Sequence, residues 1–121
     1  MDSMELMKRA VLALDDKKAD KIEVLRVDDV TILGDYFVIA SADNTTHVRA
    51  LADEVDYQLK KFDILPRSME GYQSANWIVL DYNDVIVHVF HEQARGYYNL
   101  EKLWSDGIRI DVNSIIEEAN K

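Results

Sequence analysis

The sequence has 121 residues and is 48% hydrophobic, with four Gly, one Pro and no Cys. These values suit a single compact domain spanning residues 1–121, and they exclude a disulfide framework and a thiolate metal site. The 23 acidic and 14 basic residues give a formal net charge of −9. That charge opposes contact with nucleic-acid phosphates and favours a basic protein partner.

The lack of targeting signals in the sequence predicts a cytoplasmic protein. No basic segment followed by a long apolar run opens the chain, and no apolar stretch approaches the roughly 20 residues that cross a bilayer. The lack of Cys also fits a reducing compartment. We therefore expect a soluble, cytoplasmic protein with no membrane partner and no direct nucleic-acid site.

The first two thirds of the chain alternate helix and strand patterns. Apolar residues recur every three or four positions in two segments, and β-branched and aromatic residues dominate two others. Asp2 with Glu5 predicts the start of the first helix, and Asn44 or Thr45 that of the second. The predicted elements are a helix from Ser3 to about Lys18, strands at Lys21–Val27 and Asp35–Ala42, the longest helix at Thr46–Phe62, and a loop marked by Pro66 and Gly71.

The most informative stretch predicts a β-hairpin. Two runs rich in Val, Ile and aromatic residues, 76–82 and 85–91, flank the polar pair Asn83-Asp84. A two-residue turn at this pair sets the strand register, and alternation along each strand then gives the hairpin two different faces. One face is apolar and is predicted to lie in the core; its residues are Ile78, Leu80, Tyr82, Val85, Val87 and Val89.

The opposite face of the hairpin mixes aromatic, acidic and imidazole side chains. It carries Trp77, Val79, Asp81, Ile86, His88 and Phe90, with Asp84 at the tip. A patch of aromatic groups with polar handles is typical of a partner surface. The alternative is that a helix covers this face and His88 is a buried core histidine. The pattern alone does not decide between the two.

Two further segments follow the hairpin. Arg95–Trp104 predicts a short helix or turn that packs Leu and Trp side chains onto the sheet, with Tyr97 and Tyr98 pointing in different directions. Val112–Ala119 predicts a last short helix with one apolar face.

Catalytic and metal sites find little support in the spacing. His88 and His91 lie three apart on a strand and point to opposite faces, so they do not readily chelate one ion. Asp35, Asp81 and Asp84 could converge to hold magnesium, but no Gly-rich phosphate loop accompanies them, and Asp is favoured in turns for local reasons. We expect no cofactor, no metal site and no enzymatic activity.

A series of motifs runs in order along most of the chain. The motifs are Asp35–Ser41 (DYFVIAS), His47–Ala50 (HVRA), Glu70-Gly71, Trp77–Tyr82 (WIVLDY), Asp84–Phe90 (DVIVHVF), Arg95–Tyr98 and Leu100–Trp104 (LEKLW). Together they resemble the ribosomal silencing factor family RsfS, also called Iojap. Asn83 stands where that family usually has Gly, and Asn also tolerates a left-handed turn. The recognisable pattern ends near Trp104, and residues 105–121 form a C-terminal extension.

The resemblance implies a mixed α/β domain with a nucleotidyltransferase-like fold that lacks the catalytic motif. It implies a translational repressor that binds the large ribosomal subunit at its fourteenth ribosomal protein, a basic protein, and sterically blocks joining of the small subunit. An assembly factor of the large subunit that uses the same contact is one alternative, and a metal-dependent nucleotidyltransferase is another. The resemblance leaves open whether the protein forms a homodimer. The expected contact residues are Trp77, Asp81, Asp84, His88, Phe90, Arg95, Tyr97 and Tyr98.

Overall fold

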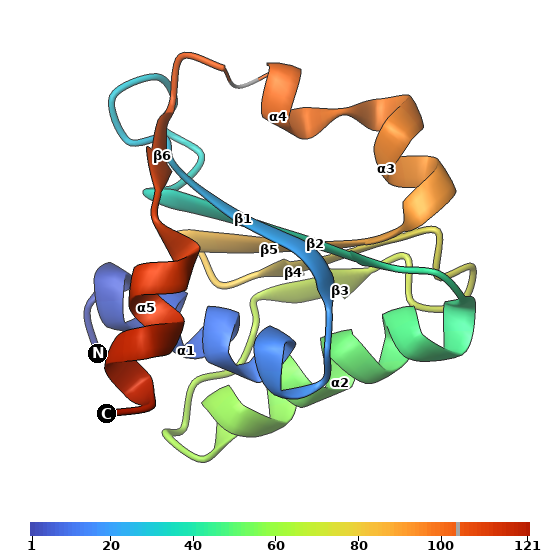
Figure 1. The fold of residues 1–121 in the computed structure, drawn as a ribbon, viewed down its shortest axis with the longest axis horizontal. Helices are drawn as coiled ribbons and strands as arrows, with labels where there is room; N and C mark the ends of the chain where they lie inside the picture. Colours follow the sequence, from blue (N-terminus) through green and yellow to red (C-terminus); the bar gives the residue numbers. More distant parts are fainter. Residues whose placement is uncertain (104) are drawn as a thin grey trace.

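The computed structural model describes residues 1–103 and 105–121, without the side chains of residues 101 and 103. Within these residues the chain forms a mixed α/β fold, in which a six-stranded sheet carries helices on both faces (Figure 1). The elements are α1 (Ser3–Asp16), β1 (Asp20–Arg26), β2 (Tyr36–Ala42), α2 (Thr45–Lys60), β3 (Ser68–Glu70), β4 (Trp77–Asp81), β5 (Val85–His91), α3 (Glu92–Tyr98), α4 (Leu100–Leu103), β6 (Ile108–Ile110) and α5 (Val112–Ala119).

The sheet is mixed, as the sequence predicts. Its strand order is β3-β4-β5-β2-β1-β6, with β2 and β5 parallel and the other neighbouring strands antiparallel. Strand β2 lies between β5 and β1 and is buried along its whole length, which explains its unbroken run of apolar and small residues. The prediction of a central strand here is confirmed.

The two long helices begin at the predicted caps. The carboxylate of Asp2 accepts a hydrogen bond of 2.8 Å from the amide of Glu5, and the side chain of Asn44 accepts one of 2.8 Å from the amide of His47. Each cap satisfies a backbone donor that has no partner inside the helix. Helix α1 ends at Asp16 and α2 at Lys60, each two residues before its predicted end.

The larger core lies between the sheet and helices α1, α2 and α5, on one side of the sheet (Figure 1). The predicted inner face of the hairpin contributes Ile78, Leu80, Val87 and Val89, and all four are fully buried. Burying each such side chain stabilises the fold by about 1.5–3 kcal/mol. This hairpin face is therefore structural, as predicted.

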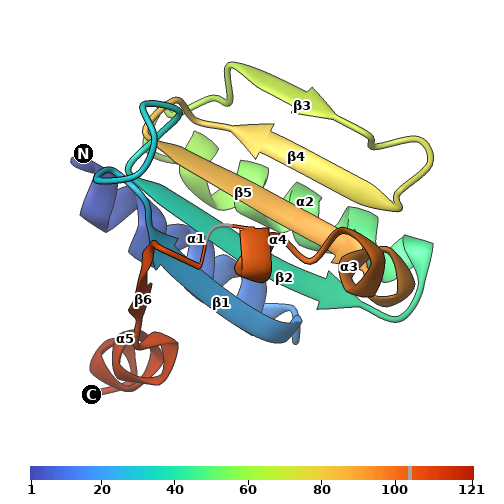
Figure 2. The same ribbon diagram turned by 90° about the horizontal axis from the view of Figure 1, so that it is seen from above.

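A smaller core lies on the other side of the sheet, which faces α3 and α4 (Figure 2). It is built from Leu25, Val27, Phe37, Ile39, Ile86, Phe90 and Leu100. The second face of the hairpin is therefore partly covered, and the alternative in which helices pack on this face applies to some of its residues.

Two strands were not expected from the sequence. Strand β3 lies in the loop predicted at Pro66 and Gly71, and β6 precedes the last helix. Each has three residues, too few to show a period-two pattern, and each depends on a longer neighbour for its pairing: β3 on β4, and β6 on β1. Residues 108–119 of the C-terminal extension thus join the sheet and pack on α1, while Trp104 lies outside the described residues.

Candidate functional site

The register of the β4–β5 hairpin decides where the predicted contact residues lie. Trp77 pairs with Phe90, Val79 with His88, and Leu80 with Val87, as the sequence predicts. The backbone of Asn83 has φ of 72°, the left-handed conformation expected at this turn. The two faces of the hairpin are therefore assigned correctly.

Trp77 is the centre of an aromatic cluster at the start of β4. Its ring stacks on Phe90, with the centroids 5.0 Å apart, and contacts Tyr98 from α3 at 4.7 Å. Its indole Nε1 donates a hydrogen bond of 3.1 Å to Nδ1 of His88. The indole is half-buried, so one part of it is held in place while another part remains accessible. A fixed, half-exposed Trp is typical of an interface anchor.

Tyr97 and Tyr98 of α3 extend this cluster into solvent. Their rings contact each other edge to face at 5.2 Å, and 83% of Tyr97 and 49% of Tyr98 are exposed. We call Trp77, Tyr97 and Tyr98 the aromatic patch. It is the part of the predicted contact surface that the structure brings together with accessible side chains.

Phe90, His88 and Arg95 are buried, and this corrects the expectation that they are exposed for a partner. Phe90 has no exposed surface, because α3 and α4 cover its position, and His88 and Arg95 retain 7% and 8%. The guanidinium of Arg95 donates hydrogen bonds to the carbonyl of Lys21 at 2.6 Å and to Oγ of Ser41 at 3.2 Å. These residues support the aromatic patch from beneath, and none offers a partner more than a small surface.

Asp81 and Asp84 lie toward the opposite end of the hairpin, about 13 Å and about 20 Å from the position of Trp77 along the strands. The carboxylate of Asp81 accepts hydrogen bonds from Asn83 N at 2.8 Å and Arg67 Nη2 at 2.7 Å. Burial raises the pKa of Asp81, but these two donors outweigh it and bring the pKa below its ordinary value. Asp81 therefore stabilises the turn, whereas the side chain of Asp84 is exposed.

The loop before Trp77 is held by residues that the sequence analysis did not identify. Arg49 of α2 donates from Nε to the carbonyl of Tyr72 at 3.0 Å and from Nη2 to that of Gln73, and the hydroxyl of Tyr72 donates to Asp53 at 3.0 Å. That hydrogen bond, together with burial, raises the pKa of Tyr72. The motif at His47–Ala50 already contained Arg49, but only the fold shows what it binds.

Gly71 makes this loop possible. Its φ is +83°, and a Cβ atom at this position would lie 2.0 Å from the carbonyl oxygen of Trp77. No side chain fits in that space, and a left-handed backbone favours glycine. Gly71 and Arg49 together fix the backbone where β4 begins, which fixes the position of the aromatic patch.

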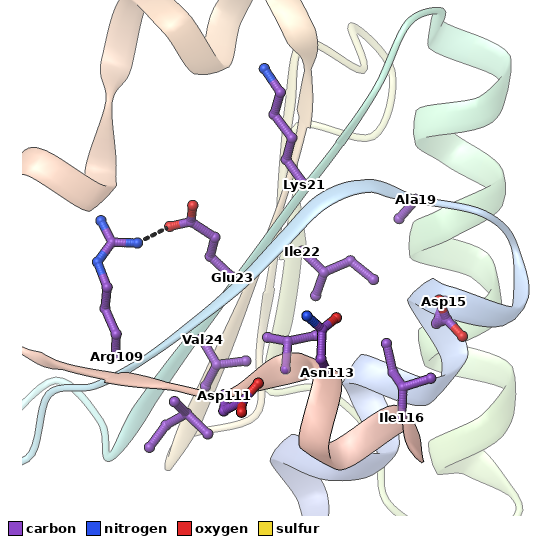
Figure 3. A pocket seen from close by; sticks show the side chains of 12 residues that line it. Asp15, Ala19, Lys21, Ile22, Glu23, Val24, Arg109, Asp111, Asn113 and Ile116 are labelled. Carbon is purple, nitrogen blue, oxygen red and sulfur yellow. Dashed lines mark hydrogen bonds and ion pairs between the residues drawn. The ribbon is translucent and has the colours of Figure 1, made fainter. Parts of the chain in front are cut away.

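A hollow outside the hairpin lies at the other edge of the sheet, where β1 passes β6 and α5 (Figure 3). It encloses about 450 Å³ and has apolar walls from Ile22, Val24 and Ile116. The ion pair between Glu23 and Arg109, 2.8 Å long, lies on one side of it. None of the predicted contact residues lines this hollow, but Arg95 lines a second one of about 490 Å³ together with Lys21 and Ser41. The aromatic patch lines neither hollow, so the accessible part of the candidate site is a surface.

The rival metal hypothesis lacks a suitable geometry. Within residues 1–103 and 105–121, no three His, Asp or Glu side chains form a group that could hold a metal ion. Asp35, Asp81 and Asp84 are thus not gathered into a magnesium site. In the same ranges, no helix is both long and apolar enough to cross a membrane.

Comparisons with known proteins identify the family of the chain. The family model "Ribosomal silencing factor during starvation" matches residues 1–121. The chain is 38% identical over 116 residues to the ribosomal silencing factor RsfS of Halalkalibacterium halodurans, covering 96% of this chain and 99% of the relative. A crystal structure of a Chromobacterium violaceum protein superposes with a TM-score of 0.85 at 35% identity, covering 87% of this chain and 88% of that one.

A more distant relative has a name that refers to ribosome assembly. The mouse protein named mitochondrial assembly of ribosomal large subunit protein 1 is 33% identical over 101 residues, covering 78% of this chain and 43% of its own length. The match to the family model covers the hairpin, the aromatic patch and the C-terminal strand and helix. The chain therefore belongs to the ribosomal silencing factor family, RsfS.

Proposed function

We propose that this protein represses translation by binding the large ribosomal subunit at its fourteenth ribosomal protein and blocking the approach of the small subunit. The aromatic patch carries the proposal. It is a fixed and accessible cluster on a chain with a net charge of −9, which suits a basic protein better than an RNA surface. Family membership supports the ribosome as the target.

Repression of this kind requires only that the protein occupies its site on the large subunit, without any chemical reaction. A protein that covers part of the subunit interface prevents joining for as long as it stays bound, so the residence time on the large subunit sets the strength of repression. Trp77 is held by Phe90, Tyr98 and His88 before binding. Little side-chain freedom is then lost on association, which favours slow dissociation. The protein acts in the cytoplasm and is not an enzyme under this proposal.

A role in assembly of the large subunit is the second candidate. The name of the mouse relative favours it, and the same surface would serve both roles. Timing separates them, because an assembly factor binds precursor particles whereas a repressor binds mature subunits. Light scattering at several concentrations tests separately whether the protein forms a homodimer.

Cosedimentation with purified large subunits, small subunits and joined ribosomes tests the proposal. We expect binding to free large subunits and a lower yield of joined ribosomes when small subunits are added afterwards. A Trp77→Ala variant should lose both effects, and a pull-down with the isolated fourteenth ribosomal protein should reproduce the contact. Binding to small subunits alone would contradict both the repressor and the assembly roles.

A further inference from the structure

The loop between β1 and β2, residues 27–35, exposes apolar side chains that no part of the proposed mechanism uses. Val30 is 39% exposed, Leu33 61%, and Ile32 has the full exposure of an isolated residue. Single exposed apolar residues are common on protein surfaces. Three within four positions at one loop tip form a patch of the kind that marks an interaction site.

This loop is held in one conformation by backbone hydrogen bonds. The carbonyl of Val27 accepts from the amides of Val30 and Thr31, both at 3.0 Å, and the amide of Val27 donates to the carbonyl of Asp35 at 2.7 Å. Oγ1 of Thr31 accepts from the amide of Leu33 at 3.1 Å. The exposed side chains therefore stand on a fixed backbone, so that little order has to be gained when a partner binds.

The loop is joined to the hairpin turn, which adds negative charge beside the apolar tip. The carbonyl of Asp84 accepts from the amides of Asp35 at 2.7 Å and Tyr36 at 3.2 Å. A Cβ at Gly34 would lie 3.2 Å from the carbonyl oxygens of Asn83 and Asp84, so the two backbones are in contact. The carboxylates of Asp29 and Asp84 are exposed and form no ion pair with the described part of the chain.

The charge around the apolar tip selects the occupant. Phosphates of nucleic acid or of an anionic membrane would meet Asp29 and Asp84 and be repelled. A second copy of this chain, itself carrying a net charge of −9, is disfavoured in the same way. A protein surface that places Lys or Arg next to apolar side chains complements both features.

We propose that the β1–β2 loop, with Asp84, is a second docking surface that binds a basic protein of the large ribosomal subunit through Ile32 and Leu33. This inference rests on the proposed function and adds a contact at the far end of the hairpin from Trp77. Figure 1 shows the loop, in cyan, on the side of the sheet that carries α3 and α4. A partner facing that side can touch the aromatic patch and the loop together.

Affinity for purified large subunits, measured with a double Ile32→Ser/Leu33→Ser variant, tests the proposal. Leu65→Ser is the matched control, because Leu65 is 63% exposed and Leu33 is 61% exposed. Leu65 lies in the segment that follows α2, and α2 packs on the other side of the sheet (Figure 1). The double variant should bind at least about tenfold more weakly, and the control should bind like the parent protein. Thermal melts of all three proteins should coincide, because exposed side chains contribute little to folding.

Each outcome separates this inference from the proposed function. If the parent binds large subunits and the double variant binds equally well, the second docking surface is refuted while the proposed function stands. If the parent fails to bind, both are refuted. Binding of purified ribosomal RNA alone that the double variant loses would also overturn the inference, since it would make the partner a nucleic acid.

Discussion

Leu80 and Trp77 lie on opposite faces of strand β4, and truncating each to Ala should separate folding from binding. Leu80 is fully buried and belongs to the larger core. Its backbone is held on both sides, by Met69 of β3 and Val87 of β5, so the site cannot collapse easily. We therefore expect Leu80→Ala to lower the free energy of unfolding by about 3 kcal/mol. For a chain of this length, that is a fall in melting temperature of roughly 10 °C.

Trp77→Ala should act mainly on binding. Its exposed part is free for a partner, where a central aromatic contributes about 2 kcal/mol or more to affinity. A smaller effect on folding is expected as well. Trp77 contacts Phe90 and Tyr98 and donates to His88, so a loss of about 1–2 kcal/mol in folding stability is expected.

The assay combines thermal melts followed by circular dichroism with binding to large subunits well below both melting temperatures. Leu80→Ala should then bind normally, because the fraction that remains folded keeps its surface. Val79→Ala, between the two positions and half-buried, provides an intermediate reference. A Leu80→Ala protein that folds normally but does not bind, alongside a Trp77→Ala protein that melts far lower, would show that the faces are assigned the wrong way round.

Three further predictions concern Gly71, Asp81 and the effect of salt on binding. Gly71→Ala should lower the free energy of unfolding in urea by at least about 2 kcal/mol, because Gly71 has a positive φ and a Cβ would meet the Trp77 carbonyl. Gly96→Ala, in a helix with open space around it, should raise it by about 0.5–1 kcal/mol. Equal effects of the two substitutions would contradict this role of Gly71. The pKa of Asp81 is lower in the folded state, so its contribution to the free energy of unfolding is fully present above the ordinary pKa of 3.8 and is lost as pH falls through the folded value. Asp81→Asn should therefore flatten the dependence of stability on pH in that range. An unchanged dependence on pH would refute the role of Arg67. The association rate with large subunits should fall as the salt concentration rises, because the screening length between exposed charges is about 8 Å at physiological ionic strength and shortens with added salt. A rate independent of salt would show that charge complementarity is not part of the mechanism.

Local patterns were sufficient to predict the hairpin. The left-handed tolerance of Asn83 and the alternation on both sides of it define the register, and the observed pairing of Leu80 with Val87 agrees. The caps at Asp2 and Asn44 were predictable for the same reason, since each forms its hydrogen bond three residues along the chain. Such features depend on near neighbours in sequence, so the sequence contains the information for them.

The exposure of the second hairpin face was not predictable in this way. Phe90 and Trp77 are paired neighbours, yet one is fully buried and the other half-buried, because α3 and α4 cover only part of the face. Where a helix docks depends on long-range contacts such as those of Arg95 with Lys21 and Ser41, 74 and 54 residues away. No periodicity within either segment reports a contact of that range.

The sequence by itself therefore determined the main helices and strands, the strand register of the hairpin, the acidic character and the family resemblance. Tertiary structure alone decided that the predicted contact residues divide between an aromatic patch around Trp77 and a separate acidic turn at Asp84, and that the exposed loop with Ile32 and Leu33 is hydrogen-bonded to that turn. The physical reason is that secondary structure follows from local hydrogen bonding and side-chain periodicity. The surface left open to a partner depends instead on which segments, distant in sequence, pack over the rest.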